Sequence, residues 1–456
     1  MTAGTDSARR DGAPRYRLYT KLRGLNADPL SVLDDIRSRH GDEPVQLDLG
    51  LSRPLLVSRP DHVEHVWRNS RDLYLRRGMM WQAMQRLQGT TGIGAEGESW
   101  DFSSKLIQPL FTGKSVAALV PRMVDAINEA VEDLAARSSG GHLVDLADEM
   151  MLISHRVLGR VFLGDVLPAT EANTVGREIA AAFGSMQARL ALPFIPHSIP
   201  LPGDRRVSRA VTTVDGILLP YIERARREPE RPDVVSMIAH AMDNDGNQLG
   251  VQQARNDVIG LFTGGTETTA VALTWAVILL NSHPQVSKRL VTEIEAVVGG
   301  ERVAGEHVKH LVYTRMVLEE SLRLYPPAWM IPRTLQAPDV LGGVDLPVGT
   351  TVVLSPYNTH RLPHLWPDPE RFDPERFAPG SKPRRHAYAY YPFGGGIHRC
   401  LGQAFFFIEA ALATAALISR FEMAVRSPES VRPKVGVSLR PRGRVLVELS
   451  TRRRSG

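Results

Sequence analysis

Long amphipathic runs occupy most of the chain between about residues 60 and 325. Apolar residues recur there with the spacing of one helix face, which predicts helices over 118–137, 146–163, 205–227, 250–281 and 284–298. The Pro-rich segment 194–204 interrupts two of these runs and predicts a loop. The pattern therefore indicates a body built mainly of α-helices.

Short β-like segments lie before and after this helical region. The sequence of residues 43–58 predicts two short strands joined by a glycine-containing turn. The sequence of residues 332–358 predicts further short strands between Gly and Pro turns. Residues 363–398, rich in Pro, Gly and aromatic side chains, predict a long ordered coil. A last helix is expected over 401–420 and a last strand over 445–449.

No internal repeat or low-complexity linker divides the chain, which predicts one large domain of the α+β class, mainly α. We expect a mobile tail over 1–14, the domain over 15–450 with its β-rich part at about 43–58 and 332–358, and a basic tail over 451–456.

Composition excludes several classes of protein. The 456 residues are 43% hydrophobic and 23% charged, as in an ordinary globular protein. The net charge of +5 is spread along the chain, which argues against a nucleic-acid-binding stripe. The most apolar stretch noted, 270–280, is too short for a membrane span, and the N-terminus has no apolar signal core. We therefore expect a cytoplasmic protein without a membrane anchor.

The single cysteine, Cys400, excludes an internal disulfide, a cysteine-based zinc site and a four-cysteine iron–sulfur cluster. It lies in the segment 393–402, Phe-Gly-Gly-Gly-Ile-His-Arg-Cys-Leu-Gly. Glycines let a chain turn tightly around a sulfur, and amide N–H groups directed at the sulfur tune a bound metal. The helix expected after Leu401 would direct its N-terminal dipole at the thiolate and favour the charged form.

This segment resembles the haem-ligand loop of the cytochrome P450 family. The resemblance implies the P450 fold, a single haem-enclosing domain, and haem b (iron protoporphyrin IX) whose iron is bound by the thiolate of Cys400. A thiolate ligand pushes electron density that favours cleavage of the O–O bond. Phe393, Gly394, Gly396 and Gly402 would be the neighbouring cofactor-binding positions.

Glu320 and Arg323 share a helix face at i and i+3, and Tyr-Pro-Pro follows one residue later. Such pairs are usually surface ion pairs, but this one resembles the ExxR helix of the same family. The family's structural triad would then be Glu320, Arg323 and Arg376. The duplicated Pro-Glu-Arg-Phe at 369–372 leaves a second choice for the third member, and the spacing from Trp366 favours Arg376.

Gly264 to Thr269, Gly-Gly-Thr-Glu-Thr-Thr, lies inside a long apolar helical run. These residues are poor helix formers, so a locally loosened helix whose threonines bond back to their own backbone is one interpretation. The segment also resembles the family's oxygen-activation helix, in which a widened turn makes room for dioxygen. Glu267 and Thr268 would be its acid–alcohol pair, which relays protons to the distal oxygen.

The carboxylates of haem need cationic partners or hydrogen-bond donors. By resemblance, His398 and Arg333 would bind these propionates, and Trp100 would open the helix that crosses the haem edge. The family usually carries an arginine four residues after that tryptophan. Here the position is Ser104, and we expect its neighbour Lys105 to substitute.

The family's pocket segments carry mostly apolar and Met-rich residues in this chain, which predicts a hydrophobic substrate such as a terpenoid, fatty acyl compound, macrolide or indole alkaloid. The expected lining residues are Met79, Met80, Trp81, Met84, Met186, Leu261, Phe262, Gly265, Ala328, Trp329, Met330, Ile331, Val437 and Ser438.

The resemblance implies a monomeric monooxygenase of secondary metabolism that takes electrons from a ferredoxin and a ferredoxin reductase and binds no nucleic acid. Lys105, Lys114 and Arg399 could form a basic dock for an acidic ferredoxin, or they could be ordinary solvated charges. Oxidative coupling or ring formation without oxygen insertion is an alternative reaction. A non-catalytic haem–thiolate binding protein and a peroxide-driven enzyme are the remaining alternatives, and the intact Glu267 and Thr268 argue against both.

Overall fold

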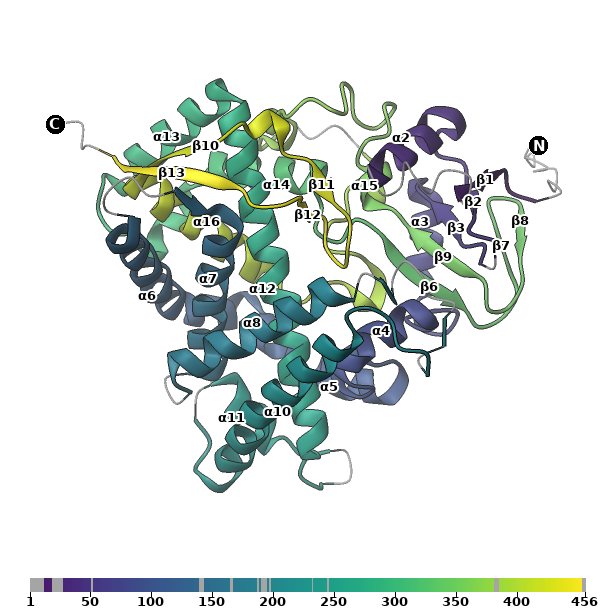
Figure 1. Cartoon of the computed structure of the whole chain (residues 1–456), viewed down its shortest axis with the longest axis horizontal. Helices are drawn as coiled ribbons and strands as arrows, with labels where there is room; N and C mark the ends of the chain where they lie inside the picture. Colours follow the sequence, from purple (N-terminus) through teal and green to yellow (C-terminus); the bar gives the residue numbers. More distant parts are fainter. Residues whose placement is uncertain are drawn as a thin grey trace.

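A helical body and a smaller sheet region lie side by side in the computed structural model (Figure 1). The described residues are 12–18, 28–50, 52–138, 143–164, 167–186, 188–189, 195–196, 198–231, 233–243, 246–380 and 385–452. Expectations for residues 1–11, for 381–384 of the predicted coil and for 453–456 lie outside these ranges, as do the side chains of Met79 and Met80.

The helical body is organised around α12 (Val251–Ser282), which is buried along most of its length between Ala254 and Leu280. A helix that is apolar on all sides is typical of a protein core. It packs closely against α7 (Leu146–Leu158), and α10 (Asp204–Arg227) packs against α8 (Ala169–Ser185). The other helices in the described part of the chain are α2 (Pro29–His40), α3 (Pro60–Arg68), α4 (Met79–Gln88), α5 (Gly97–Ile107), α6 (Gly113–Ser138), α11 (Val234–His240), α13 (Pro284–Val298), α14 (Val312–Leu324), α15 (Pro356–Thr359) and α16 (Gln403–Arg420).

Short helical turns join several of these elements. A π-helical turn, Gly159–Leu163, extends α7, so the predicted run 146–163 is helical throughout. The 3₁₀ turns are Gly92–Gly94, Gln108–Phe111, Gly305–His310, Pro374–Phe377, Ala387–Ala389, Gly396–His398 and Pro428–Ser430.

The largest sheet has six strands in the order β1-β2-β3-β9-β6-β4 and lies beside α3 and α4 (Figure 1). Its strands are β1 (Arg15–Arg17), β2 (Val45–Asp48), β3 (Leu55–Val57), β4 (Tyr74–Leu75), β6 (Ile331–Leu335) and β9 (Thr351–Leu354). A three-stranded sheet β10-β13-β5 lies on the far side of the helices, and β7-β8 and β11-β12 are hairpins. Their bounds are β5 (Leu143–Asp145), β7 (Asp339–Leu341), β8 (Val344–Leu346), β10 (Phe421–Val425), β11 (Pro433–Lys434), β12 (Arg440–Pro441) and β13 (Leu446–Thr451).

The predicted helices and strands are present with small shifts in their ends. The expected 250–281 helix is α12, and the two strands expected in 43–58 are β2 and β3, which pair antiparallel. β13 continues to Thr451, which pairs with Phe421, so regular structure reaches into the segment expected as a basic tail.

One expectation about membranes needs correction. Among the described residues, the stretch Gly396–Arg420 is long and apolar enough, by length and composition alone, to cross a membrane. However, 72% of its apolar window is buried inside the protein. The apolar character of α16 therefore matches its place in the core beside α6, α13 and α14.

Candidate active site

The segment before Cys400 is a tight loop that packs against α3. Gly394 and Gly396 have positive φ angles of 68° and 61°, a region that L side chains avoid. A Cβ atom on Gly396 would lie 2.4 Å from the carbonyl oxygen of Trp67, so only glycine fits there. The loop closes where the Cys400 N–H donates to the Phe393 carbonyl at 2.9 Å. The glycines thus bring the cysteine to a fixed place at the start of α16.

The Cys400 thiol lies deep in the protein yet is accessible to a solvent-sized probe, as expected for a group that faces an internal space. Burial raises the pKa of this thiol, while the Gly402 N–H and the Arg399 guanidinium act in the opposite direction. The thiolate form of Cys400 therefore depends on groups that stabilise its negative charge. These groups are the Gly402 N–H, the N-terminus of α16 and a bound metal cation.

Glu320 and Arg323 form a fully buried ion pair on α14. The Arg323 guanidinium donates to both Glu320 oxygens, at 2.6 and 2.8 Å, and to the carbonyls of His360, Pro369 and Arg371. Arg376, from the 3₁₀ turn after β9, lies 3.4 Å from Glu320 Oε1. The structure therefore brings together the three residues expected as a structural triad.

The middle of α12 contains an accessible strip within a buried helix. Gly264 is exposed and Thr268 is half-buried, while their neighbour Glu267 is 3% exposed. The helix shows no break here, which differs from the widened turn implied by the resemblance. The Thr268 hydroxyl donates to the Gly264 carbonyl at 2.6 Å, so the threonine bonds back to its own backbone as the first interpretation predicted.

Two expected pocket residues on α12 face other helices. A Cβ atom on Gly265 would lie 2.8 Å from the Leu158 side chain, so this glycine allows close approach of α7. Phe262 is fully buried and makes an edge contact with Phe162. These contacts do not test the assignment of the two residues to the pocket, so both assignments stay predictions. Because α12 is buried along most of its length, its sequence pattern does not set which side faces the open space.

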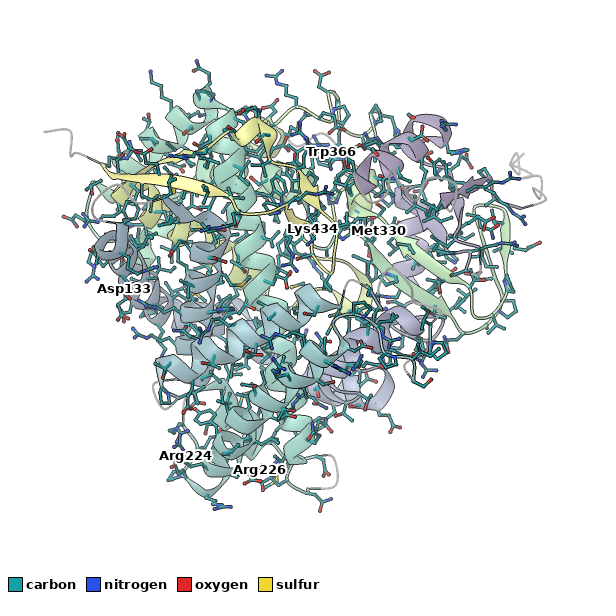
Figure 2. All side chains as sticks on the ribbon, in the orientation of Figure 1. Asp133, Arg224, Arg226, Met330, Trp366 and Lys434 are labelled. Atoms are coloured by element: carbon teal, nitrogen blue, oxygen red, sulfur yellow. The ribbon has the colours of Figure 1, made fainter. Side chains whose placement is uncertain are left out.

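The remaining pocket candidates fall into two groups. Trp81 and Trp329 are partly exposed, and their indole N–H groups donate to the Pro332 and Gly436 carbonyls at 3.1 and 3.0 Å. Met84, Leu261, Ala328, Met330, Ile331 and Val437 are also partly exposed. Met186 and Ser438 are buried, at 2% and 3% exposure. Figure 2 shows Met330 near the middle of the molecule, between the helical body and the sheet.

Arg333 and His398 meet in a cluster of charged groups. Arg333 is 2% exposed, its Nε atom has no hydrogen-bond partner, and burial lowers the pKa of its guanidinium to about 9. Burial also lowers the pKa of His398 to about 4. The Trp100 ring makes an edge contact with the His398 ring at 4.8 Å. The two residues expected to bind the haem carboxylates and the tryptophan expected at the haem edge thus belong to one region.

Two members of this cluster, Arg76 and Glu96, were missed by the sequence analysis. Arg76 Nε lies 3.1 Å from Glu96 Oε1, and Glu96 Oε2 lies 3.1 Å from His398 Nε2. Burial alone would raise the pKa of Glu96, but His398 and Arg76 together lower it to about 2. Nothing in the local sequence separates Arg76 from its exposed neighbour Arg77, because both are long cationic side chains at the end of β4.

Lys105 does not join this cluster through any contact among the described residues. It is exposed and follows Asp101 by one helical turn, and Asp101 pairs with Arg71. Ser104, the position of the family's arginine, is buried. Arg76 is therefore better placed than Lys105 to act with Arg333 and His398.

The comparisons with known proteins agree with this geometry. A family model described as Cytochrome P450 matches residues 15–447. The chain belongs to the cytochrome P450 family. It has the P450 fold expected from the sequence, a single mainly helical domain with small sheets, and its activity is that of a haem–thiolate monooxygenase.

Three matches illustrate the range of this P450's relatives. A cyclooctat-9-en-7-ol 5-monooxygenase from Streptomyces melanosporofaciens is 32% identical over 87% of this chain and 85% of the relative. A pentalenene oxygenase from Streptomyces avermitilis is 29% identical over 89% of each chain. The crystal structure of a mutant P450DA haem domain superposes with a TM-score of 0.85 at 20% identity, over 97% of this chain and 98% of that one.

The residues of this P450 fit a haem group. Cys400 provides one accessible sulfur with an amide donor, which suits a single thiolate ligand. Arg333 and His398 retain ring or guanidinium nitrogens without hydrogen-bond partners, although such buried groups are normally satisfied. A guanidinium nitrogen and an imidazole nitrogen without partners, together with a lone thiol, suit the propionates and the iron of haem.

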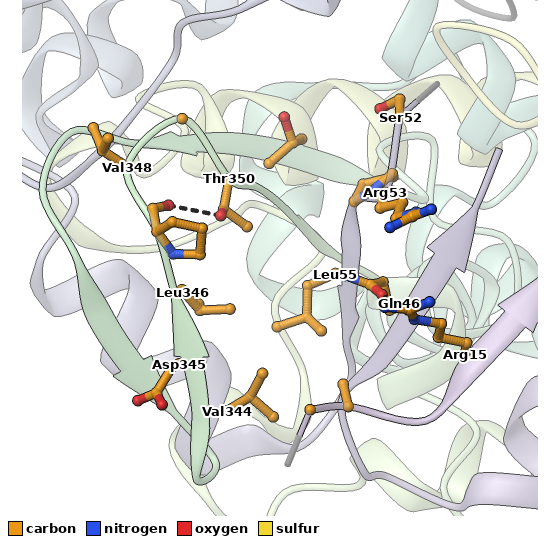
Figure 3. A pocket seen from close by; sticks show the side chains of 16 residues that line it. Arg15, Gln46, Ser52, Arg53, Leu55, Val344, Asp345, Leu346, Val348 and Thr350 are labelled. Atoms are coloured by element: carbon orange, nitrogen blue, oxygen red, sulfur yellow. Dashed lines mark hydrogen bonds between the residues drawn. The ribbon is translucent and has the colours of Figure 1, made fainter. Parts of the chain in front are cut away.

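A cleft of about 710 Å³ lies away from this site (Figure 3). Val344 and Leu346 face Leu55, Gln46 and Arg15 across it, at the edge of the six-stranded sheet. No residue of the Cys400 loop lines this cleft, and it plays no part in the site.

Proposed function

We propose that this P450 monooxygenase oxidises a hydrophobic cyclic terpenoid. The proposal rests on the apolar, partly exposed side chains at the expected pocket positions, which include Leu261, Ala328, Met330 and Val437. None of the residues expected to line the pocket is charged. The two curated relatives are named for oxidation of cyclooctat-9-en-7-ol and pentalenene, which are cyclic terpenoids. The macrolide, fatty acyl and indole alkaloid classes lack support of this kind.

We infer that the thiolate of Cys400 is the iron ligand of the haem. The bound haem supplies the activation of dioxygen by two electrons. The Gly402 N–H and the N-terminus of α16 stabilise the negative charge on the sulfur. Arg333, His398 and Arg76 hold the haem carboxylates, and the Glu320–Arg323–Arg376 triad fixes the chain that precedes the loop.

Glu267 and Thr268 are the proposed proton relay. Glu267 is a buried carboxyl whose Oε2 atom has no partner, and Thr268 presents its hydroxyl on the accessible strip of α12. A hydroxyl next to a carboxyl can pass protons from solvent toward reduced dioxygen. The apolar pocket walls hold the substrate and exclude bulk water.

P450 chemistry requires an electron donor, and we propose a ferredoxin with its reductase. Lys105, Lys114 and Arg399 are all exposed, and Arg399 precedes the cysteine. An acidic partner attracted to these charges would bind more weakly as salt concentration rises. Reversing the charge at Lys105 or Lys114 should slow the first electron transfer while leaving reduction by dithionite unchanged.

The test combines haem spectra with ligand titrations. The reduced wild-type protein with carbon monoxide should show a strongly red-shifted Soret band, and Cys400→Ala should lose it. Pentalenene and cyclooctat-9-en-7-ol should displace the distal water and shift the ferric spectrum at lower concentration than a long-chain fatty acid or a macrolide. A red-shifted band combined with a response only to the fatty acid or macrolide would refute the terpenoid assignment alone. A red-shifted band that persists in Cys400→Ala would refute the ligand assignment.

A further inference from the structure

The carboxyl of Glu267 is held from outside its own helix by the β11–β12 hairpin. Ser438 donates a short hydrogen bond to Glu267 Oε1, and Arg440 Nη2 lies 3.4 Å from the same oxygen. Both residues are far from Glu267 in the sequence, Ser438 by 171 positions. The contact therefore depends on the fold, and the α12 motif alone gives no sign of it.

The hairpin is anchored on both sides of these residues. Trp329 Nε1 donates to the Gly436 carbonyl at 3.0 Å, and Trp275 Nε1 donates to the Leu439 carbonyl at 2.8 Å. The Leu439 N–H donates in turn to the Pro327 carbonyl at 3.1 Å. Because the backbone is fixed before and after Ser438, its hydroxyl and the start of the Arg440 side chain have little freedom to move.

The two oxygens of the Glu267 carboxyl have different surroundings. Oε1 receives the contacts from Ser438 and Arg440, whereas Oε2 is buried and has no hydrogen-bond partner. A buried oxygen of this kind is normally satisfied by protein or water. Oε2 is thus the atom available to accept a proton and pass it on.

The Arg440 guanidinium lies between α12 and α8. A Cβ atom on Gly184 of α8 would be 3.8 Å from Arg440 Nη2, so this glycine leaves room for the guanidinium. The Arg440 side chain is 30% exposed, against 5% for that of Glu267. An arginine cannot donate its proton at any ordinary pH, so its influence on Glu267 is electrostatic and positional.

We propose that Arg440, assisted by Ser438, is a positioning residue for proton delivery in this P450. It favours the ionised carboxylate of Glu267 over the neutral acid and fixes Oε1, so that Oε2 is the oxygen that gains each proton and gives it up toward the Thr268 hydroxyl. One proton is gained and one is lost in each transfer, and the carboxylate is restored. The inference rests on the proposed function, because it requires Glu267 to serve as the relay acid.

The pKa of Glu267 gives the direction of the effect. Burial raises this pKa, and Arg440 and Ser438 lower it again. Among the residues that the structure describes, Arg440 is the only charged group that acts on this pKa. Removing either hairpin residue should therefore raise the pKa of Glu267 further and move every pH-dependent step that it controls to higher pH.

The experiment follows electron consumption with dioxygen as the only acceptor, driven by a surrogate ferredoxin and reductase, as a function of pH and in H₂O and D₂O. Arg440→Gln should move the pH profile to higher pH and increase the solvent isotope effect. Arg440→Lys should restore much of the wild-type profile because it keeps the charge. Lys434→Gln is the matched control, since Lys434 pairs with Arg440 across the hairpin but is not among the groups that shift the pKa of Glu267.

Glu267→Gln separates failure of this inference from failure of the proposed function. If Glu267→Gln changes the profile and Arg440→Gln does not, the hairpin only packs against α12 and the inference is overturned. If Glu267→Gln itself has no effect, Glu267 is not the relay acid and the proposed function fails at that point. If Arg440→Gln does not retain haem, Ser438→Ala must show the same upward shift for the inference to stand.

Discussion

Replacing Glu320 with glutamine should destabilise the protein by about 3–5 kcal/mol, the usual cost of breaking a buried ion pair by removing one partner. Both side chains of the Glu320–Arg323 pair are completely buried. The new glutamine side chain would present an amide N–H₂ to a guanidinium that still carries its charge. The neighbouring Arg361 and Arg376 already disfavour the charge on Arg323, so we expect the upper part of this range.

Two other substitutions, one at a largely buried partner and one at an exposed ion pair, provide reference values for the cost of Glu320→Gln. Arg376→Gln should cost only about 1–2 kcal/mol, because Glu320 keeps both of its bonds to Arg323. Arg289→Gln, which removes an exposed partner of Glu375, should cost at most about 1 kcal/mol. The free energy of unfolding would be measured by urea titration of the haem-loaded proteins, at equal protein concentration and with far-ultraviolet circular dichroism.

The double variant Glu320→Leu, Arg323→Met tests the mechanism. Replacing a buried pair with apolar residues is often neutral. In this protein, the double variant would leave the carbonyls of His360, Pro369 and Arg371 without their hydrogen-bond donor. Each carbonyl left unsatisfied should lower the free energy of unfolding by about 1–3 kcal/mol. We therefore expect the double variant to remain destabilised. A double variant as stable as the wild type, or a Glu320→Gln protein no less stable than Arg289→Gln, would refute this account of the triad.

Three further predictions follow from the same structure. Arg76→Gln should release haem about 10- to 100-fold faster to apomyoglobin, as expected for loss of a charge-assisted hydrogen bond, whereas Lys105→Gln should release it at the wild-type rate. Thr268→Ala should divert electrons to hydrogen peroxide and lower product per electron about tenfold or more, and unchanged coupling would remove its relay role. Burial raises the pKa of Asp257 to about 6, so the folded state binds a proton more tightly than the unfolded state and stability falls as pH rises from about 4 to 6. Asp257→Asn should remove that fall. In urea titrations, its free energy of unfolding relative to that of the wild type should rise by roughly 3 kcal/mol between about pH 4 and pH 6. If the free energies of unfolding of the two proteins change with pH in the same way, the assignment is contradicted.

The parts of the site that could be predicted from sequence are those defined by short spacings. Glu320 and Arg323 share one helix face, and the glycines around Cys400 are needed by the turn itself. Local geometry determines both arrangements. The bounds of long helices such as 205–227 and 284–298 were predictable for a similar reason, since the period of their apolar residues follows directly from the rise and twist of a helix.

The rotational phase of α12, meaning which of its sides faces the pocket, could not be predicted from the sequence. Adjacent residues point about 100° apart, so Gly264 can face open space while Gly265 contacts Leu158. An amphipathic helix reveals its phase through its polar face. α12 has no such face around Phe262, and only its packing against α7 determines which residues reach the pocket.

Arg76 and Arg440 show a second limit, which concerns charged residues. Each belongs to a short series of arginines, and charged side chains are exposed far more often than buried. What distinguishes them is a carboxylate supplied by a distant segment: Glu96 for Arg76, and Glu267 for Arg440. A buried cation is stable only with such a partner, so its role is encoded in two places at once. The functional arginines of this P450 are therefore identified by the fold that brings each pair together, and a substitution at either partner should be interpreted as a change to the pair.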